Sequence, residues 1–309
     1  MQRYQIGLMF LLAALGLVLP FPLRAAHALQ PSATPTAPSL PPCYETQGRT
    51  EEGSFRSQAM LEKVTYLVHL PPCYNVYTDR RYPVLYLFHG WPMNQTHWLN
   101  LGMPDLADRW ITWHLVAPFI IVMPGVGPDG DYIHTSGGDD SFEGMVVNEL
   151  VPLIDRTYRT WTAPEARAVG GISRGAVWSL EIGLRHPDLF SIIGSHSPAL
   201  ALNNPWRDHD PYVLILNGAP GQRLYLDGGT LDWANADAQK FARVAREAGA
   251  DVTLQTHVGA HVDALWQSAL GDYLFFYTRT WPASVADLPR IPGADELNKP
   301  VPNLPEAQP

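Results

Sequence analysis

The stretch Gly171-Ile172-Ser173-Arg174-Gly175 has the residue types and spacing for nucleophilic chemistry at a serine hydroxyl. It lies between a predicted strand, Arg167–Ile172, and a predicted helix, Ala176–Arg185. A serine on a tight turn at the carboxyl end of a strand is exposed, and flanking glycines allow that turn. The backbone N–H of Arg174 would then point toward a developing oxyanion. The spacing therefore predicts Ser173 as a nucleophile.

A serine nucleophile needs a general base, and two histidines far downstream are candidates. In this arrangement the chain order is serine, acid, histidine. His261 lies in a Gly-Ala-His loop between the last predicted strand and the last predicted helix. His257 belongs to the apolar–polar alternation of that strand, which is typical of a half-buried structural histidine. We therefore favour His261 as the base.

Asp232 is the favoured acid that would orient the base. The predicted strand Arg223–Asp227 runs into a Gly-Gly-Thr-Leu-Asp loop, from which the Asp232 carboxylate can reach an imidazole and select its tautomer. Asp227 is the alternative acid, although its position at the strand end also suits a turn cap. Asp263 is too near His261 in sequence to orient that ring easily.

A second oxyanion donor is expected in the loop after an early central strand. The predicted strand Val84–Phe88 leads into His89-Gly90-Trp91, where the glycine allows close approach. The N–H of Trp91 is the expected partner of the Arg174 amide. We expect His89 to brace this turn and His196 to pack beside the site. The Arg174 side chain is expected at the surface or in a salt bridge, with substrate contact as the alternative.

Alternating strand and helix signals fill residues 45–281. Strands buried on both faces read as short apolar runs, and no change of composition inside this block marks a boundary. The pattern predicts a single α/β domain with a doubly wound, mostly parallel sheet flanked by helices. Tyr212–Leu216 has a strand-like composition but also suits a short helix or loop. The predicted strands are Lys63–Leu70, Pro83–His89, Phe119–Met123, Arg167–Ile172, Phe190–Ser195, Gln222–Asp227 and Val252–Val258, and the predicted helices are Met145–Tyr158, Ala176–Arg185, Asn235–Ala248 and Asp263–Tyr277.

The start of the chain has the composition of an export signal. Arg3 precedes the apolar run Ile6–Leu23, and Ala26-His27-Ala28 supplies the small–x–small pattern that a signal peptidase recognises. An uncleaved anchor is the alternative, because the run is close to the lower length limit of a spanning helix. Two prolines inside the run favour cleavage. We therefore expect residues 1–28 to be a signal peptide and the mature protein to be secreted, periplasmic or at the cell surface, without stable membrane insertion.

The segments that flank the predicted domain are rich in proline. Residues 29–44 also contain many Ser, Thr and Ala residues, which is typical of a linker. Residues 282–309 contain seven prolines and little periodicity, so we expect a loose C-terminal tail. Cys43 and Cys73 are the two cysteines of the chain, and an even number in an exported protein favours a disulfide over two unpaired thiols.

Composition excludes several classes of protein. The chain has 309 residues, of which 46% are hydrophobic and 17% charged, as expected for a globular protein with a sizeable core. A net charge of −9 argues against binding to a nucleic-acid phosphate backbone. Two cysteines cannot form a four-thiolate zinc site, and the histidines lack metal-ligand spacing. We expect no metal and no nucleic-acid partner.

Several blocks of the chain resemble the putative esterase family, which includes esterase D, feruloyl esterases, enterochelin esterases and the antigen 85 mycolyltransferases. The resemblance covers roughly residues 60–280. Two departures are Ala260, where glycine is usual, and Cys73, where the family more often has glycine, which fits a bridge to Cys43. The similar blocks are Tyr82–Gly90, Gly170–Gly175, Arg185–Phe190, Leu226–Asp232 and Gly259–His261 with the later Trp266.

The resemblance implies an α/β-hydrolase fold and a triad that carries over to Ser173, Asp232 and His261. The oxyanion amides of the family fall on Trp91 and Arg174. Acyl transfer through a serine needs no metal or organic cofactor, so none is expected.

These observations favour a secreted serine esterase that acts on small-molecule or carbohydrate-linked esters, with acetyl or hydroxycinnamoyl acyl groups as the leading substrates. Trp91, Trp206 and Trp233 lie in loops expected to face the site, where they could stack on sugar or aryl groups or simply pack over the sheet. The alternatives are an acyltransferase of the antigen 85 type and an inactive binding protein on the same scaffold. The acyl group, the alcohol and the oligomeric state stay open.

Overall fold

The computed structural model describes residues 40–126 and 137–292. The predicted signal peptide, residues 1–28, lies outside these residues, as do most of the predicted linker and the tail from residue 293 onward. Within the described part, no helix is long and apolar enough to cross a membrane.

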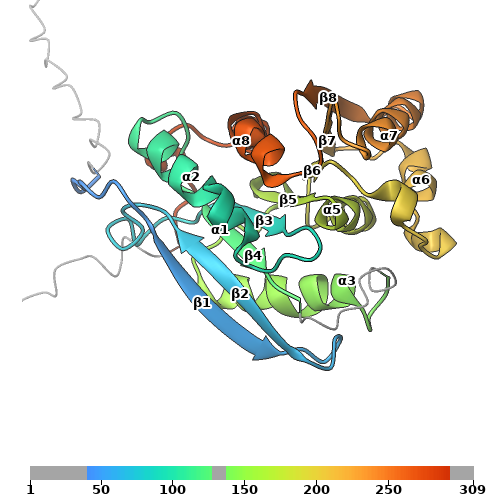
Figure 1. Ribbon diagram of the computed structural model, residues 1–309. Coiled ribbons are helices and arrows are strands. Elements are labelled where there is room, and N and C mark those ends of the chain that lie inside the picture. Colours follow the sequence, from blue (N-terminus) through green and yellow to red (C-terminus); the bar gives the residue numbers. More distant parts are fainter. Residues whose placement is uncertain (1–39, 127–136, 293–309) are drawn as a thin grey trace, which may run out of the picture. The chain divides into compact units, whose positions relative to one another are not determined.

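An eight-stranded sheet forms the centre of the described domain (Figure 1). The strands follow the order β1-β2-β4-β3-β5-β6-β7-β8. β1 and β2 are antiparallel to each other, β2 is antiparallel to β4, and all other neighbours are parallel. The mostly parallel, doubly wound sheet predicted from the sequence is therefore confirmed. The strands are β1 Arg49–Arg56, β2 Lys63–Leu70, β3 Val84–Phe88, β4 Ile120–Pro124, β5 Arg167–Ile172, β6 Ile192–His196, β7 Arg223–Gly229 and β8 Asp251–His257.

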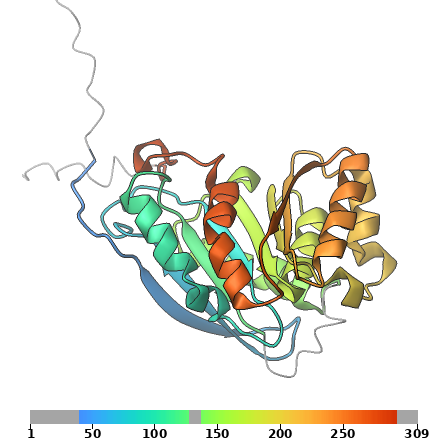
Figure 2. The same cartoon turned by 45° about the horizontal axis from the view of Figure 1, so that its top comes forward.

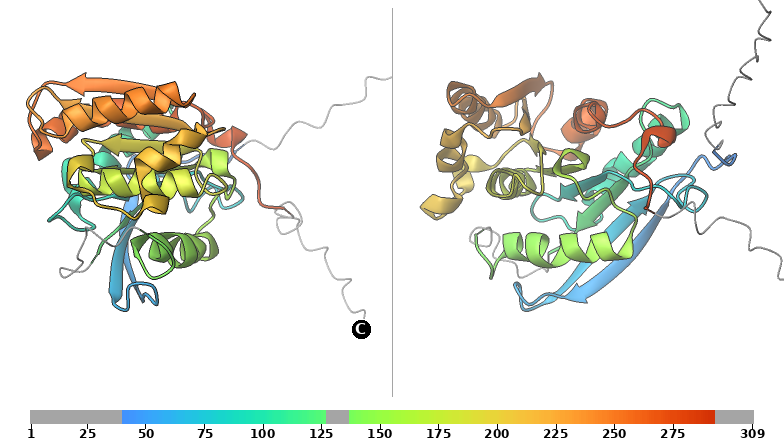
Figure 3. Two further views of the ribbon diagram at one scale, coloured as in Figure 1. Left: turned by 90° about the vertical axis from the view of Figure 1, so that its right-hand side faces the viewer. Right: turned by 180° about the vertical axis from the view of Figure 1, so that it is seen from behind.

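Helices cover both faces of the parallel strands. α2 and α8 lie side by side over one face (Figure 2). Figure 3 shows α4, α5 and α7 together on the other face. The helices are α1 His97–Leu101, α2 Met103–Thr112, α3 Phe142–Gly144, α4 Val151–Thr157, α5 Arg174–Arg185, α6 Pro211–Leu214, α7 Asn235–Glu247 and α8 Asp263–Thr278, with a π-helical segment, Met145–Leu150, between α3 and α4.

Two hydrophobic layers result, one on each side of the sheet. Alternate residues of one strand enter opposite layers, so Leu85 and Leu87 pack under α1, α2 and α8 while Val84 and Tyr86 pack toward α4 and α5. All residues of β3, β4 and β5 are buried. This explains why β3 and β4 are continuous apolar runs in the sequence.

β1, α1 and α2 were not predicted from the sequence. β1 lies at the sheet edge with one side exposed, and its sequence RTEEGSFR carries too few apolar residues to predict a strand. α1 and α2 meet at Gly102, which has a left-handed φ of 91°, and Pro104 opens α2. A Gly-x-Pro sequence suggests a turn, although proline is tolerated in the first turn of a helix. Residues 211–214, left open between strand and helix, are helical.

The ends of the domain are tied to its body. Cys43 and Cys73 form a disulfide, as expected, and it joins the N-terminal arm to the segment after β2. Leu288 is buried, and its carbonyl oxygen accepts a hydrogen bond from Arg80 at 3.0 Å. The expectation of a loose tail is therefore wrong for residues 282–292, because these contacts anchor the segment to the domain.

Candidate active site

Ser173 lies on a sharp turn between β5 and α5. Its backbone has φ 56° and ψ −108°, an uncommon conformation for a residue other than glycine, and its N–H donates to the His196 carbonyl at 2.8 Å. A Cβ on Gly171 would lie 2.1 Å from the Gly175 carbonyl oxygen, and one on Gly175 would lie 2.5 Å from that of Phe88. Both positions therefore require glycine, because the backbone passes too close for a side chain. This close packing holds the Ser173 hydroxyl at the carboxyl edge of the sheet.

A hydrogen-bonded relay connects Ser173 to Asp232 through one imidazole. The Nε2 atom of His261 lies 2.9 Å from the Ser173 Oγ, and its Nδ1 lies 2.8 Å from the Asp232 Oδ1. A carboxylate can only accept, so Nδ1 carries the proton and Nε2 faces the hydroxyl as an acceptor. This tautomer is the one that a general base requires. We call Ser173, His261 and Asp232 the relay.

The Asp232 carboxylate is held in its ionised form. Burial raises its pKa, but the hydrogen bonds from His261 and from the protein around it outweigh burial and lower the pKa below its usual value. One of these is donated to Oδ1 by the Ala234 N–H at 2.8 Å. An ionised and fixed carboxylate stabilises positive charge on the imidazole when it takes a proton.

The loops that carry Asp232 and His261 are joined by backbone hydrogen bonds. The N–H of Thr230 donates to the His257 carbonyl and that of Leu231 to the Gly259 carbonyl, both at 2.8 Å. A Cβ on Gly229 would lie 2.2 Å from the Gly259 carbonyl oxygen. The end of β7 and the loop after β8 therefore form one packed unit.

Two tryptophans fix the ring of His261 from different sides. Trp233 lies against its face, with centroids 4.4 Å apart and planes at 34°, and Trp266 meets it edge-on at 5.1 Å and 86°. The indole N–H of Trp266 donates to the Ser197 hydroxyl at 3.0 Å. Aromatic packing of this kind limits the rotamers of the imidazole.

The loop after β3 brings Trp91 beside Ser173. A Cβ on Gly90 would lie 3.4 Å from the Ile172 carbonyl oxygen, so this loop passes directly against the turn that carries Ser173. His89 braces it from within, as expected, because its Nδ1 lies 2.9 Å from the Gly90 carbonyl oxygen. Burial lowers the pKa of His89 to about 4, so the ring is neutral.

The side chain of Arg174 does not lie at the surface, so the surface alternative of that expectation is wrong. It is buried, donates to the Asn203 Oδ1 at 2.9 Å and lies over the Trp178 ring at 5.7 Å. Asn203 in turn donates to the buried Glu181 at 2.9 Å. These contacts fix the first turns of α5 to the loop that follows β6. The Arg174 amide, directly after Ser173, lies in this fixed part of the helix.

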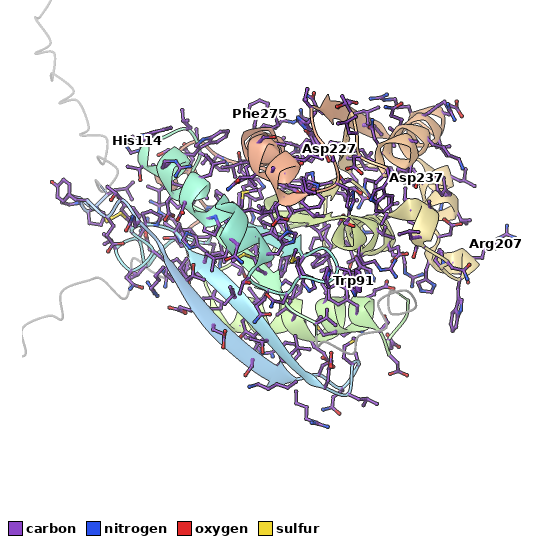
Figure 4. The ribbon with its side chains drawn as sticks, in the orientation of Figure 1. Trp91, His114, Arg207, Asp227, Asp237 and Phe275 are labelled. Carbon is purple, nitrogen blue, oxygen red and sulfur yellow. A yellow bond between two sulfur atoms is a disulfide. The ribbon has the colours of Figure 1, made fainter. Side chains whose placement is uncertain are left out.

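Asp227 is not part of the relay. Asp227 is labelled in Figure 4. Its carboxylate is fully buried and lies near His196, His257 and the Tyr273 hydroxyl. The structure therefore does not place Asp227 where it could orient the base. The turn-cap alternative is also wrong, because the carboxylate contacts these side chains inside the sheet. His257 is half-buried in β8 and His196 is fully buried, as expected.

A cavity of about 430 Å³ opens onto the relay. Sequence reasoning missed His97, which comes from α1 and has no recognisable motif around it. Trp206 is 79% exposed and does not line this cavity, unlike Trp91. A cavity of about 680 Å³ elsewhere contains no relay residue. The residues that line the relay cavity are Gly90, Trp91, Met93, His97, Ser173, His261, Val262, Asp263, Ala264 and Trp266.

The described residues offer one cluster with the donor atoms and spacing for a metal, namely Cys43, Glu45 and Cys73. Both cysteines are joined in the disulfide, so their sulfurs are not thiolate ligands. The cluster does not fit a metal, and it lies outside the relay cavity.

Known proteins resemble this chain in sequence and in fold. An endo-1,4-beta-xylanase/feruloyl esterase of Xylanibacter ruminicola is 34% identical over 154 residues, which is 48% of this chain and 21% of that protein. The chain thus matches about a fifth of the length of this relative. A solved ferulic acid esterase superposes with a TM-score of 0.69 at 23% identity, covering 77% of this chain and 100% of the other.

An S-formylglutathione hydrolase of Staphylococcus aureus also superposes, with a TM-score of 0.63 at 17% identity, covering 75% of this chain and 99% of the other. Esterases with different substrates therefore share this fold, and the fold alone does not select among them. A family model described as "Putative esterase" matches residues 57–276. The chain belongs to the putative esterase family and has its α/β-hydrolase fold.

Proposed function

We propose that this protein is a serine esterase that hydrolyses carboxylic esters through an acyl-enzyme on Ser173. The observation that carries the proposal is the relay, in which one imidazole lies 2.9 Å from a serine hydroxyl and 2.8 Å from a carboxylate. Family membership supports ester hydrolysis as the reaction class. The open cavity beside Ser173 gives a substrate access to the hydroxyl.

Acylation begins when the Ser173 oxygen attacks the ester carbonyl carbon and its proton passes to the His261 Nε2. The carbonyl electron pair moves onto oxygen, and the resulting oxyanion accepts hydrogen bonds from the amides of Trp91 and Arg174. Collapse of this intermediate breaks the ester C–O bond. The leaving alcohol takes the proton from His261, and the acyl group stays on Ser173.

Deacylation repeats these steps with water. A water molecule gives its proton to the His261 Nε2 and attacks the acyl carbon. Collapse of the second intermediate releases the carboxylic acid, and the Ser173 oxygen recovers the proton from His261. Asp232 stabilises the imidazolium in both halves and needs no proton of its own.

The proposed substrates are small-molecule or carbohydrate-linked esters with acetyl or hydroxycinnamoyl acyl groups. The feruloyl esterase named among the relatives supports a hydroxycinnamoyl group. Trp91 lines the cavity and is 68% exposed, so a flat aryl or sugar ring can stack on it. We also propose that the mature protein is exported, and the disulfide between Cys43 and Cys73 supports an oxidising compartment.

The test is hydrolysis of p-nitrophenyl acetate, butyrate and octanoate and of methyl ferulate by the wild type and by Ser173→Ala. The variant is expected to lose at least about 10⁴-fold in kcat/KM while circular dichroism and Tm stay close to the wild type. A variant as active as the wild type would contradict the proposal. Product partitioning with an added sugar alcohol separates hydrolysis from acyl transfer, and a folded wild type without turnover would favour a binding protein.

A further inference from the structure

A second histidine–aspartate pair lies in the relay cavity, and the proposed chemistry does not use it. His97 begins α1, and its side chain is 3% exposed. Its Nε2 lies 3.1 Å from the Asp263 Oδ1, and its Nδ1 accepts the N–H of Gly90 at 3.2 Å. Gly90 is the residue directly before Trp91, whose amide is the expected oxyanion donor.

The partners of His97 determine its tautomer. A backbone N–H can only donate, so the Nδ1 atom that accepts from Gly90 must be unprotonated. The single proton of the neutral ring is then on Nε2, where the Asp263 carboxylate accepts it. Burial lowers the pKa of His97, and Asp263 opposes this only in part, so the ring stays neutral near pH 7. An imidazolium would present a second donor to the Gly90 N–H and break that contact.

The pair connects the two loops that must cooperate around the substrate. Asp263 follows His261 by two residues at the start of α8, whereas Gly90 belongs to the loop after β3. Trp266 meets both rings edge-on, at 6.0 Å and 87° for His97 and at 5.1 Å and 86° for His261. The neighbouring Trp98 donates its indole N–H to the Phe88 carbonyl at 2.9 Å, which fixes the end of β3 from the same helix.

We propose that His97, as a neutral imidazole oriented by Asp263, is a positioning residue that holds the Gly90–Trp91 backbone so that the Trp91 amide faces the oxyanion. The inference rests on the proposed esterase function. His97 does not touch the reacting atoms, and it acts through the peptide that it holds. A displaced amide weakens the hydrogen bond to the transition state more than the binding of the ground-state ester.

The kinetic test compares His97→Leu with a matched control, His69→Leu. His69 is also buried and paired with an aspartate, at 2.9 Å from Asp108, but neither lines the relay cavity. We expect His97→Leu to lower kcat about 10- to 100-fold with KM changed less than threefold, as for a misplaced oxyanion donor. His69→Leu is expected to lower Tm and to keep kcat within about twofold, assayed well below both melting temperatures.

A rescue variant separates positioning from packing. The amide oxygen of His97→Asn can take the place of Nδ1 as the acceptor for Gly90, whereas leucine offers no acceptor. His97→Asn is expected to be at least about tenfold faster in kcat than His97→Leu. A trifluoromethyl ketone, which forms a tetrahedral oxyanion on serine, should lose affinity for His97→Leu by about the factor lost in kcat/KM.

Three results of the kinetic and binding assays would overturn the inference. These are equal kcat values for His97→Leu and His69→Leu, a His97→Asn variant as slow as His97→Leu, or unchanged affinity for the ketone. In addition, ¹⁵N-correlated spectra of the imidazoles should show the Nε2–H form of His97 at pH 7, and an Nδ1–H form or an imidazolium would contradict the proposal without any kinetic assay. A wild type that lacks Ser173-dependent turnover would instead contradict the proposed function, so the two failures are distinguishable.

Discussion

Two aspartates near the end of β7 each lie against histidines, but in different surroundings. Asp232 lies past the strand in a loop, and the His261 ring that it contacts is 15% exposed toward the cavity. Asp227 lies inside the strand, is fully buried, and is 3.3 Å from both His196 and His257. We call Asp227, His196, His257 and Tyr273 the buried cluster.

The difference lies in what the far nitrogen of each ring faces. In the relay, the Nε2 of His261 faces the Ser173 hydroxyl. In the buried cluster, the Nε2 of His196 faces the Tyr277 hydroxyl at 2.8 Å, and burial lowers the pKa of His196 so that the ring is neutral. A contact between a carboxylate and an imidazole is therefore common to both regions. Access to a nucleophile and to a cavity distinguishes them.

Strand geometry explains why the two aspartates, five residues apart in the sequence, belong to different regions. His196 and Asp227 are register partners on the parallel neighbours β6 and β7, so the ladder itself brings them together inside the sheet. Residues in the strands are covered by helices on both faces, whereas residues a few positions later leave the ladder and reach solvent. The same carboxyl edge thus supplies a structural cluster first and a reactive one after it.

Of the substitutions that test this comparison, Asp232→Asn is expected to have the largest effect. An amide in place of the carboxylate favours the wrong tautomer of His261 and cannot stabilise the imidazolium, so kcat should fall about 10³- to 10⁴-fold. Steady-state kinetics with p-nitrophenyl acetate measure this effect, and far-ultraviolet circular dichroism checks the fold. A kcat within tenfold of the wild type would mean that Asp232 does not orient His261.

Asp227→Asn should affect stability and leave catalysis almost unchanged. Removing the charge leaves the half-buried His257 with only the more distant Asp272 carboxylate, 3.9 Å from its Nδ1, at a cost of about 2–4 kcal/mol in the free energy of unfolding. We expect kcat to stay within about threefold of the wild type. Urea unfolding followed by tryptophan fluorescence measures the first quantity. A fall in kcat as large as that of Asp232→Asn would erase the distinction between the two regions.

The pH dependence of stability provides a test of the buried cluster by itself. Burial raises the pKa of Asp227, but His196, His257 and Tyr273 outweigh it and bring the pKa to about 2. The contact with Asp227 raises the pKa of His257 despite partial burial of that ring. At pH values above about 4, the carboxyl pKa of the unfolded chain, the lowered pKa of Asp227 contributes about 2 kcal/mol to the free energy of unfolding. This contribution is lost as the pH falls toward 2.

The contribution of His257 has the opposite sign. This contribution is present at pH values below about 6.5, the pKa of a histidine in the unfolded chain. It is lost as the pH rises through the raised pKa of His257 in the folded protein. The stability difference between the wild type and Asp227→Asn should therefore be largest between about pH 4 and pH 6.5 and smaller on both sides. Urea unfolding of both proteins at a series of pH values measures this difference. A difference that does not change with pH would contradict the ion-pair description.

Part of this arrangement could be predicted from the sequence, because the signals for it are local. Ser173 lies in a five-residue pattern between a strand and a helix, and the chain order then selects Asp232 and His261. The parallel strands were equally visible, because β3 and β4 are uninterrupted apolar runs and β8 alternates apolar with polar residues. β1 was not, because at a sheet edge its residues are mostly exposed and carry no apolar alternation.

The buried cluster and His97 depend on contacts between distant segments. Asp227 resembles a turn cap until β6 places His196 beside it, and nothing in the sequence around His97 indicates that its ring accepts from Gly90. Tyr277 illustrates the same limit, because a Cβ on Gly170 or Gly194 would lie within 2 Å of its hydroxyl. These glycines are required by a helix that arrives about 80 residues or more later in the chain.

The smallest expected effect is that of Tyr273→Phe, which removes one donor from the buried cluster and no charge. The Tyr273 hydroxyl donates to the Asp227 Oδ2 at 2.6 Å, and burial keeps the phenol protonated by raising its pKa well above the usual value. Loss of this hydrogen bond should cost about 1–2 kcal/mol in the free energy of unfolding and leave kcat within about twofold. Without this donor the pKa of Asp227 rises, so the loss of stability in acid should begin at a higher pH than in the wild type. Urea unfolding between pH 3 and pH 7 measures both effects, with Tyr44→Phe, at a side chain that is 89% exposed, as the matched control. If Tyr273→Phe lowered kcat by tenfold or more without a loss of stability, the buried cluster would have to be counted with the relay.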